Sequence, residues 1–288
     1  MNTIHFIINP NSGKKKGKQF HDYLTSLQNE KFVIKLSSFI GETVELAKKS
    51  VEEKASIIVS CGGDGTLREV ASALVNTDIP LGIIPIGSGN GVARALKIPL
   101  KPELALRQLL HGKIATIDVG KVNENYFFSN FGIGIDSEII NTFSSQTTRG
   151  LIGYVKSSVL TIFKFKPIKL KITLENKSIE NTYFLCNVAN ANQIGYDFTF
   201  SPEAQLNDGL LNVLMVEKFN FFGWLAYGYY FMQKRIKNFS KATNINTKFI
   251  EIEVISDVKC YQLDGDKIAL NNKKFSISII ENGLKVIC

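Results

Sequence analysis

The chain has 288 residues, of which 44% are hydrophobic and 21% charged, close to the averages of globular proteins. This composition excludes collagen-like, coiled-coil and disordered chains, and the length suffices for one large or two ordinary domains. A formal net charge of +8 favours anionic partners, a class that includes nucleic acid, anionic lipid and phosphorylated small molecules.

Four cysteines are scattered along the chain, with no Cys-x-x-Cys pair and no histidine at ligand spacing. We therefore expect neither a disulfide framework nor a zinc site, and a cytoplasmic location. The apolar run at residues 4–8 is broken by Asn9-Pro10 too early for an export signal. Uncharged windows such as Phe219–Gln233 are shorter than the roughly 20 residues of a membrane-spanning helix.

Short apolar runs alternate with helical patterns over about the first 120 residues, which predicts a parallel α/β sheet. Strands are expected at residues 3–8, 32–36, 56–60 and 81–85, and helices at 18–29, 43–54, 67–75 and 92–96. Three of these strands run into loops rich in glycine or asparagine, at residues 9–13, 61–66 and 87–91.

From Ile114 onward the pattern changes to closely spaced strand-like runs. Strands are expected at residues 117–122, 126–134, 168–174, 184–189, 210–216, 249–254 and 275–280, and helical segments at 151–163 and 221–236. The predicted fold is an α/β N-terminal domain with a parallel sheet, residues 1–122, followed by a mostly-β C-terminal domain, residues 123–288.

The loop Gly62-Gly63-Asp64-Gly65-Thr66 follows a strand and opens a helix, so backbone N–H groups and a positive helix end converge there. This arrangement suits phosphate oxygens, although a plain tight turn is an equally good explanation of one such loop. Two better-known nucleotide-binding motifs, the P-loop and the dinucleotide-binding pattern, do not match the sequence. The segment Gly13–Gln19 has the wrong glycine spacing for a P-loop, and Gly87–Val92 lacks the third glycine of the dinucleotide-binding pattern.

The three loops together resemble the successive nucleotide-site motifs of the diacylglycerol kinase catalytic-domain family, which includes bacterial lipid kinases and sphingosine and ceramide kinases. The matching segments are Asn9-Pro10-Asn11-Ser12-Gly13, Gly62–Glu69 and Pro85–Arg94. In the second half, Ile117–Gly120, Phe131–Asp136, Leu206–Leu210 and Leu263-Asp264-Gly265-Asp266 extend the resemblance over nearly the whole chain.

The resemblance implies a nucleotide cleft between the two domains. The residues that it assigns to the nucleotide are Asn9, Asn11, Ser12, Gly13, Ser37, Gly62, Gly63, Gly65, Thr66, Glu69, Ser88 and Asn90. Magnesium is implied at Asp208, together with backbone carbonyls at Gln205 and Leu210. One carboxylate with carbonyls and water is an acceptable magnesium shell.

Asp266 is the candidate general base, because it occupies the position where the family usually has glutamate. Aspartate reaches less far by one methylene, and Leu263–Lys267 is also a good hairpin sequence in which Asp266 would be a turn carboxylate. Asp64 is the competing base, since related sphingosine kinases are thought to use that aspartate.

Two segments combine apolar and basic residues in the way that contact with an anionic membrane requires, namely 149–169 and 219–241. Packing of both helices on the β-sheet explains their apolar residues equally well. No helix-turn-helix, zinc finger or RNA-binding aromatic pattern accompanies the positive charge, so we expect no nucleic-acid partner.

The sequence and the resemblance together predict an ATP- and Mg²⁺-dependent lipid kinase that is cytoplasmic and peripherally membrane-associated, with a homodimer suggested by relatives alone. Diacylglycerol is the leading substrate. Gly87-Ser88-Gly89-Asn90 is closer to sphingosine and ceramide kinases, which leaves a sphingoid lipid open. Two further candidates are NAD kinase, which shares the Gly-Gly-Asp-Gly-Thr loop, and a non-catalytic regulator that binds lipid or nucleotide.

Overall fold

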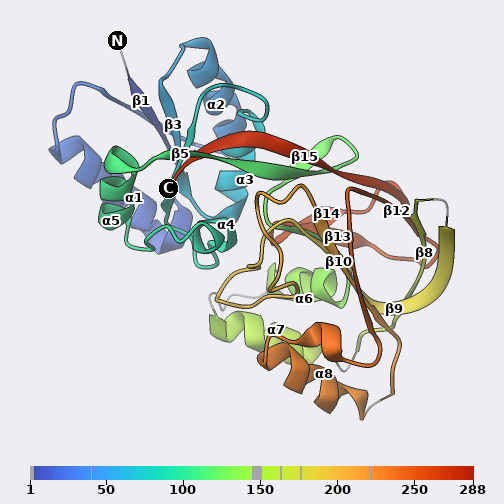
Figure 1. Ribbon diagram of the computed structural model, residues 1–288. Coiled ribbons are helices and arrows are strands. Elements are labelled where there is room, and N and C mark those ends of the chain that lie inside the picture. The colour runs from blue at the N-terminus through green and yellow to red at the C-terminus, as the bar shows by residue number, and fades with distance from the viewer. Residues whose placement is uncertain (1–2, 40, 145–150, 163, 176, 221) are drawn as a thin grey trace. The chain divides into compact units, whose positions relative to one another are not determined.

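The computed structural model describes residues 3–39, 41–144, 151–162, 164–175, 177–220 and 222–288 (Figure 1). The chain forms two compact units: unit 1 comprises residues 1–119 and 281–288, and unit 2 comprises residues 120–280. The predicted division assigned residues 281–288 to the second domain, whereas their contacts place them in unit 1. Strands β5 (Ile114–Val122) and β15 (Lys274–Ile287) each carry the chain from one unit to the other.

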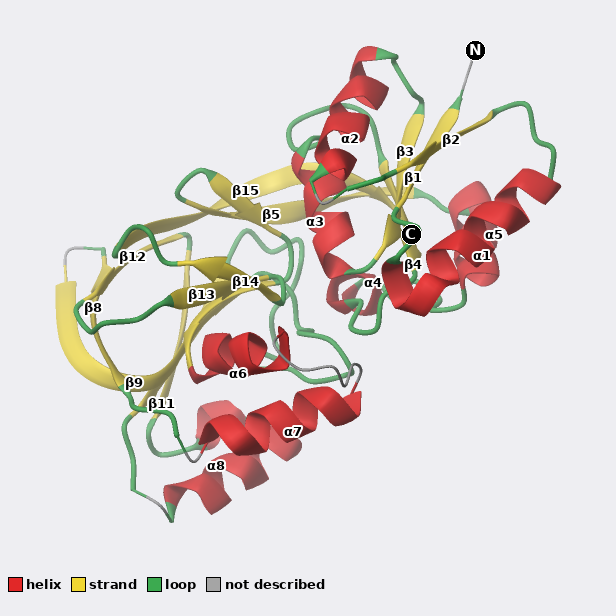
Figure 2. Ribbon diagram, turned by 180° about the vertical axis from the view of Figure 1, so that it is seen from behind, coloured by secondary structure: helices red, strands yellow, loops and turns green. Residues whose placement is uncertain are grey.

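Unit 1 contains a parallel sheet in the order β2-β1-β3-β4. Its strands are β1 (Ile4–Ile8), β2 (Phe32–Leu36), β3 (Ile57–Gly62) and β4 (Leu81–Pro85), and its helices are α1 (Ser12–Ser26), α2 (Glu42–Glu52), α3 (Asp64–Ser72), α4 (Gly91–Ala95) and α5 (Pro102–His111). Helices α2 and α3 cover one face and α1 and α5 the other (Figure 2). The central strands are therefore apolar along nearly their whole length, as expected when both faces are buried.

The predicted α/β class of the first half is confirmed. Strands β2 and β4 have the predicted bounds, and regular helical geometry in α1 begins only after Lys15, because residues 13–15 have positive φ. Helix α5 was not predicted, although Ala105, Leu106 and Leu109 have helical spacing and form its buried face.

Unit 2 is mostly β, as predicted. Its further strands are β6 (Asn125–Phe127), β7 (Asn130–Gly134), β8 (Ile168–Leu174), β9 (Lys177–Ala189), β10 (Leu211–Glu217), β11 (Ala242–Thr247), β12 (Phe249–Val254), β13 (Cys260–Leu263) and β14 (Asp266–Ala269). The long strand β9 pairs antiparallel with β8 through its first half and with β7 and β10 through its second. Strands β8 and β12 alternate buried and exposed residues, so one face of the sheet meets the core.

Among the described residues, unit 2 also contains the helices α6 (Ile135–Ser144), α7 (Leu151–Ile162) and α8 (Gly223–Met232) and the short 3₁₀-helix η1 (Ile236–Asn238). The predicted strand 126–134 is divided into β6 and β7, and β11 was missed because its sequence, Ala-Thr-Asn-Ile-Asn-Thr, lacks apolar alternation. Arg149, Phe163 and Phe221, at the ends of predicted segments, lie outside the described residues. In the described part of the chain, no helix has the length and apolar character needed to cross a bilayer.

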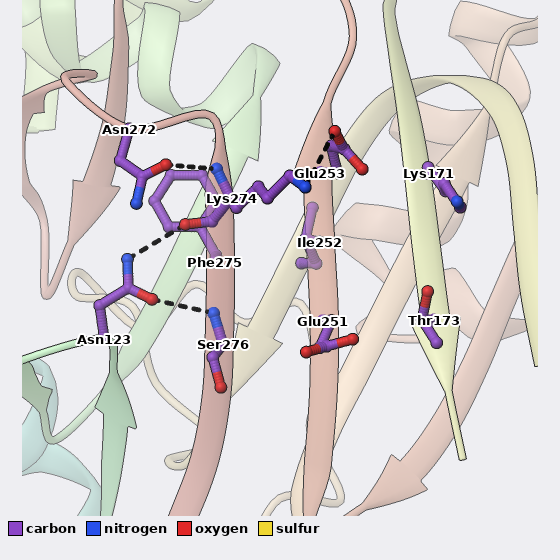
Figure 3. Close-up of a pocket in the computed structure, with 10 residues that line it drawn as sticks. All are labelled: Asn123, Lys171, Thr173, Glu251, Ile252, Glu253, Asn272, Lys274, Phe275 and Ser276. Carbon is purple, nitrogen blue, oxygen red and sulfur yellow. Dashed lines mark hydrogen bonds and ion pairs between the residues drawn. The ribbon is translucent and has the colours of Figure 1, made fainter. Parts of the chain in front are cut away.

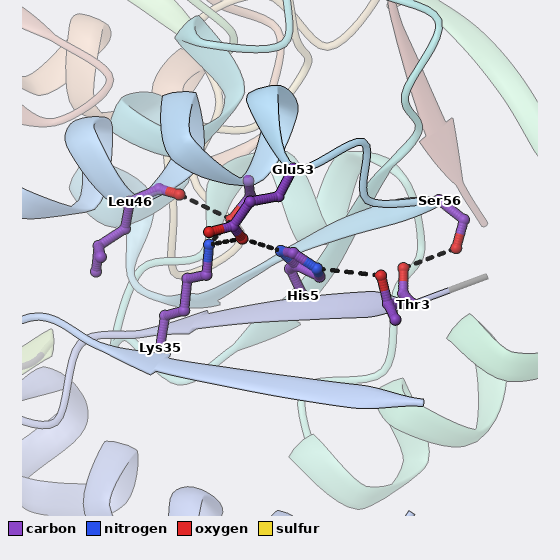
Figure 4. Close-up of polar contacts among 7 residues, drawn as sticks. Thr3, His5, Lys35, Leu46, Glu53 and Ser56 are labelled. Carbon is purple, nitrogen blue, oxygen red and sulfur yellow. Dashed lines mark hydrogen bonds and ion pairs between the residues drawn. The ribbon is translucent and has the colours of Figure 1, made fainter. Parts of the chain in front are cut away.

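A buried histidine, His5, is the second residue of β1 in the parallel sheet (Figure 4). The Nδ1 atom of His5 is 3.5 Å from Glu53 Oε2, and its Nε2 atom is 3.1 Å from Thr3 Oγ1. Lys35 Nζ donates to Glu53 Oε2 at 2.6 Å and to Ser50 Oγ at 2.9 Å. Burial, reinforced by the Lys35 charge, lowers the pKa of His5 below its ordinary value of 6.5, against a smaller opposing effect of Glu53.

This burial gives a pH-dependent stability. The unfolded chain binds a proton at His5 at a higher pH than the native state does, so the free energy of unfolding falls as pH drops below 6.5, until native His5 is also protonated. We expect His5→Gln to flatten that dependence, measured by urea denaturation between about pH 7.5 and 5.5. A variant with the slope of the parent chain in this window contradicts the assignment.

Candidate nucleotide and catalytic site

The three predicted loops meet at one edge of the parallel sheet in unit 1. Ile8 of β1 pairs with Cys61 of β3, and Cys61 pairs with Ile84 of β4, so the residues that follow these strands leave the sheet side by side. Strands β2 and β3 lie on opposite sides of β1, which makes this edge the topological switch point of the sheet. In open α/β sheets, ligands bind at this position.

Glycines allow the loops to approach closely. A β-carbon at Gly13, whose φ is +59°, would overlap the Ile86 carbonyl oxygen, and one at Gly87 would lie 2.5 Å from the Gly63 Cα. The first and second loops are therefore both packed against the third, and neither contact tolerates a side chain at these glycines.

Asp64 ties the second loop to the third. Its Oδ2 accepts the Asn90 N–H and its Oδ1 accepts the Gly91 N–H, both at 2.7 Å. This carboxylate therefore supplies hydrogen-bond acceptors for the backbone N–H groups at the start of α4. The Asn90 side chain in turn donates to the Gly87 carbonyl at 2.8 Å. Asp64 therefore has a structural role, because it links the second loop to the third, whether or not it also accepts a proton in the reaction.

A pocket of about 270 Å³ opens beside these loops within unit 1. Seven of the predicted nucleotide residues line it: Asn9, Ser12, Ser37, Gly63, Gly65, Thr66 and Glu69. Gly62 and Asn90 instead line a gap of about 10 Å³ next to Asp64, which is too small for a ligand. Neither of these two spaces is lined by Asn11, Gly13 or Ser88.

Phe39, Gly41 and Thr43 also line this pocket and were not predicted. An aromatic residue three positions after the end of β2, at the carboxyl edge of the sheet, was the available signal for Phe39, which is exposed. The Thr43 hydroxyl donates to the Glu69 carboxylate, which links α2 to α3. Asn9 Nδ2 lies 3.4 Å from Thr66 Oγ1, so the first loop and the start of α3 share the pocket wall.

The pocket has a chemically divided lining. At the start of α3 the first backbone N–H groups have no partner within the helix, an arrangement that favours phosphate oxygens. Glu69, one turn further along, is an acceptor suited to hydroxyl or amino groups and would repel phosphate. A nucleotide, which carries both kinds of group, matches this division.

Asp208 lies in an exposed loop of unit 2. Its Oδ1 accepts the Leu210 N–H at 3.0 Å, while Leu206 is buried and holds the loop to the core. The predicted donors, one carboxylate and the carbonyls of Gln205 and Leu210, are all oxygen atoms, a chemistry that suits magnesium completed by water. Within the described residues no three His, Cys, Asp or Glu side chains gather at metal-binding distance. A magnesium ion there would therefore depend on carbonyls and water.

Asp266 begins β14 directly after a two-residue hairpin turn. Asp264 and Gly265 have φ values of +51° and +83°, and Leu263 pairs with Asp266, which is the Asp-Gly hairpin that the sequence suggested. The turn fixes the position of the Asp266 backbone, and the residue is half-buried.

Buried hydrogen bonds of Asp264 and Gln262 hold this hairpin in place, and the sequence did not predict them. The Asp264 carboxylate accepts the N–H groups of Phe128, Ser129 and Asn130 at 2.7–3.1 Å. Gln262 Oε1 accepts the Gly265 N–H at 3.0 Å, and its Nε2 donates to the Asn130 side chain.

Asp136 completes the same buried network. Its Oδ1 accepts the Ser137 N–H at 2.8 Å, and its Oδ2 faces Gln262 Nε2 at 3.4 Å and Asn187 Nδ2 at 3.5 Å. Burial raises the pKa of Asp136 to about 6, and these hydrogen bonds offset only part of that effect.

A second pocket, of about 400 Å³, lies on the outer face of β8, β12 and β15 in unit 2 (Figure 3). Its lining mixes charges of both signs, including Lys171, Glu251 and a Lys274–Glu253 pair at 3.7 Å. None of the predicted site residues lines it.

Comparison with known proteins identifies the class. Residues 3–122 match the diacylglycerol kinase catalytic domain, and residues 130–278 match the YegS C-terminal NAD kinase β-sandwich-like domain. The chain belongs to the diacylglycerol kinase catalytic-domain family and is a lipid kinase. Membership of a kinase family implies ATP as the phosphoryl donor.

Individual relatives agree with this assignment. The chain is 28% identical to a diacylglycerol kinase of Bacillus subtilis, over 76% of this chain and 75% of the relative. It is 28% identical to a "Probable lipid kinase YegS-like" of Yersinia enterocolitica, over 83% and 82% of the two chains. Among solved structures, a Bacillus anthracis diacylglycerol kinase has a TM-score of 0.76 at 22% identity, covering 99% of this chain and 96% of that one. Yeast NADH kinase has a TM-score of 0.57 at 9% identity, covering 99% and 83%.

Replacement of Asp64 by Asn tests whether its hydrogen bonds stabilise the fold. An amide keeps one acceptor but turns an N–H₂ toward one of the two backbone donors, so we expect a loss of about 1–3 kcal/mol in the free energy of unfolding. Urea denaturation measures it, with the exposed Asp257→Asn as the matched control. Equal stability of the two variants contradicts this role.

Replacement of Asp136 by Asn tests the buried network through pH. The native state keeps its proton up to about pH 6 and the unfolded chain only to 3.8, so stability of the parent chain falls as pH rises through this window, by about 3 kcal/mol in total. We expect the variant to lack this decrease, so its stability relative to the parent rises between about pH 4 and 7. A relative stability that is constant with pH overturns the assignment.

Proposed function

We propose that the protein transfers the γ-phosphate of ATP to a hydroxyl group of diacylglycerol and produces phosphatidic acid. The observation that carries the proposal is the packing of three loops beside a pocket of about 270 Å³, whose lining suits a nucleotide, in a chain of the lipid kinase family. The Bacillus subtilis relative that is named a diacylglycerol kinase supports the choice of lipid.

Residues 1–122 bind ATP in this proposal. Asn9, Ser12 and Thr66 contact the nucleotide, and the N–H groups at the start of α3 bind its phosphates. Asp64 keeps the second and third loops together, so that these donors are in position before ATP arrives. Such preorganisation is what phosphoryl transfer requires, because positioning and charge neutralisation supply most of its rate enhancement.

Residues 123–288 supply the candidate magnesium ligands and the general base that acts on the lipid hydroxyl. Asp208, with the carbonyls of Gln205 and Leu210, would hold magnesium, which neutralises charge on the phosphates when bound. Asp266 removes the proton of the lipid hydroxyl as that oxygen bonds to the γ-phosphorus and the bond to the ADP oxygen breaks. The hydrogen bonds of Asp264 and Gln262 fix the hairpin that carries Asp266.

NAD is a second candidate acceptor, favoured by the fold shared with yeast NADH kinase. The Gly87-Ser88-Gly89-Asn90 loop keeps a sphingoid lipid as a third candidate. We also propose a cytoplasmic homodimer in peripheral contact with an anionic membrane surface, a contact that the net charge of +8 supports.

Transfer of labelled γ-phosphate from ATP tests the proposal, with diacylglycerol, monoacylglycerol, sphingosine and ceramide in mixed micelles and NAD in solution. We expect label in diacylglycerol, dependence on Mg²⁺, and a loss of about 10²–10⁴-fold in kcat for Asp266→Asn, the usual contribution of a general base. Asp208→Asn should raise the Mg²⁺ concentration needed, and Asp257→Asn is the control.

Other outcomes redirect the assignment. Label in sphingosine, ceramide or NAD replaces the substrate, and a loss of kcat confined to Asp64→Asn excludes Asp266 as the base. ATP binding without turnover on any acceptor leaves a non-catalytic regulator.

A further inference from the structure

Helix α7 buries small and hydroxyl-bearing residues and exposes several of its large apolar ones. Among the α7 residues whose burial is described, the buried ones are Gly153, Ser157 and Thr161. Ser157 donates to the Gly153 carbonyl, and Thr161 contacts Thr142. Its exposed residues include Ile152 and Val159, at 78% and 50% exposure, together with Val155 and Leu160. A helix on the surface of a globular protein normally has the opposite arrangement.

Helix α8 is apolar on two sides. Trp224, Tyr227 and Phe231 pack inward on a cluster that also receives Ile162 from α7. The residues exposed to solvent form a second stripe at helical spacing: Phe222, Leu225, Tyr229 and Met232, each between 64% and 75% exposed. Packing on the sheet, which the sequence left open as an explanation, therefore accounts only for the inner stripe.

The two helices lie side by side within unit 2 in both views (Figures 1 and 2). We call their exposed residues the apolar face: Ile152, Val155, Val159, Leu160, Phe222, Leu225, Tyr229 and Met232. Exposed apolar side chains on neighbouring helices mark a site of contact with a protein or a membrane.

The charges of the two sequence segments that carry this face indicate the partner. Segments 139–174 and 218–250, which contain α7 and α8, hold twelve of the 34 Lys and Arg residues and none of the 26 Asp and Glu residues. The rest of the chain therefore carries four more acidic than basic residues, and the whole positive excess belongs to these segments. Lys156, Lys164, Lys166 and Lys241 are exposed there.

We propose that the apolar face of α7 and α8 inserts into the interface of an anionic membrane, with the surrounding lysines on the lipid headgroups. Apolar residues on one side of a helix and lysines at its borders are the features of helices that lie in a bilayer interface. The inference deepens the proposed function, since it rests on a lipid substrate reached at a membrane, but binding can be measured without catalysis.

Vesicle flotation of the full chain, without ATP, tests it with phosphatidylcholine vesicles containing or lacking about 30% phosphatidylglycerol. Two apolar variants are compared: Ile152→Ser with Val155→Ser and Val159→Ser, and Leu225→Ser with Tyr229→Ser and Met232→Ser. We expect each to reduce partitioning into anionic vesicles at least about tenfold. The control is Leu104→Ser with Leu110→Ser, which removes exposed leucines from α5 of unit 1.

Charge variants separate headgroup attraction from insertion. Lys156→Gln with Lys164→Gln should lower partitioning about fivefold for each lysine, and added salt should reduce this difference. The control is Lys48→Gln with Lys54→Gln, which removes one exposed lysine within α2 and one just beyond its end. The intrinsic fluorescence of Trp224, the only tryptophan, gives a second readout through quenching by brominated lipid.

Phosphoryl transfer to a short-chain, monomeric diacylglycerol, measured on the same variants, keeps this inference separate from the proposed function. Lost vesicle binding with unchanged transfer supports the membrane contact, and lost binding in a chain that phosphorylates no lipid supports the contact while overturning the kinase assignment. Partitioning that is equal in parent, apolar variants and control overturns the contact. So does a change of oligomeric state in the apolar variants with unchanged vesicle binding, because the face then joins two copies of the chain.

Discussion

The close approach of three loops at the carboxyl edge of the parallel sheet is the constraint on which the candidate nucleotide site depends. Parallel pairing of β1, β3 and β4 brings the loops to one edge, but it does not hold them together. That requires glycine at positions 13 and 87, where a side chain would meet backbone, and a carboxylate at position 64 that accepts two backbone N–H groups. The donors that would receive phosphate are therefore ordered by contacts between loops, without a ligand.

The two candidate bases differ in how their surroundings constrain them. Both carboxylate oxygens of Asp64 accept short hydrogen bonds from backbone N–H groups of the third loop, so this side chain holds two loops together. Asp266 is held through its backbone, by a hairpin whose turn residue Asp264 is buried and accepts three N–H groups. The side chain of Asp64 therefore links two loops, whereas the hairpin that carries Asp266 is held by the side chain of Asp264.

The sequence allowed the architecture and the loop positions to be predicted, because each depends on local signals. Apolar runs ending in glycine place β3 and β4 correctly within two residues, and the Asp-Gly pair at 264 and 265 predicts the hairpin. Gln262 and Asn187 were missed, since their contacts come from residues distant in the chain. Strand β11 was missed because its pairing with β10 gives it a strand conformation that its own polar sequence does not predict.

Helix α7 shows why amphipathicity alone is an incomplete guide. Its periodic apolar residues predict a helix correctly, and the usual inference is that these residues face the core. In the structure Ser157 and Thr161 are buried instead, and the hydroxyl of Ser157 bonds to a backbone carbonyl of its own helix. Small residues on the buried side let α7 pack closely on α6, and Ile152, Val155, Val159 and Leu160 are left exposed. In water such exposure promotes aggregation, whereas in a bilayer interface it stabilises binding, so the same residues imply that the chain is not always surrounded by water.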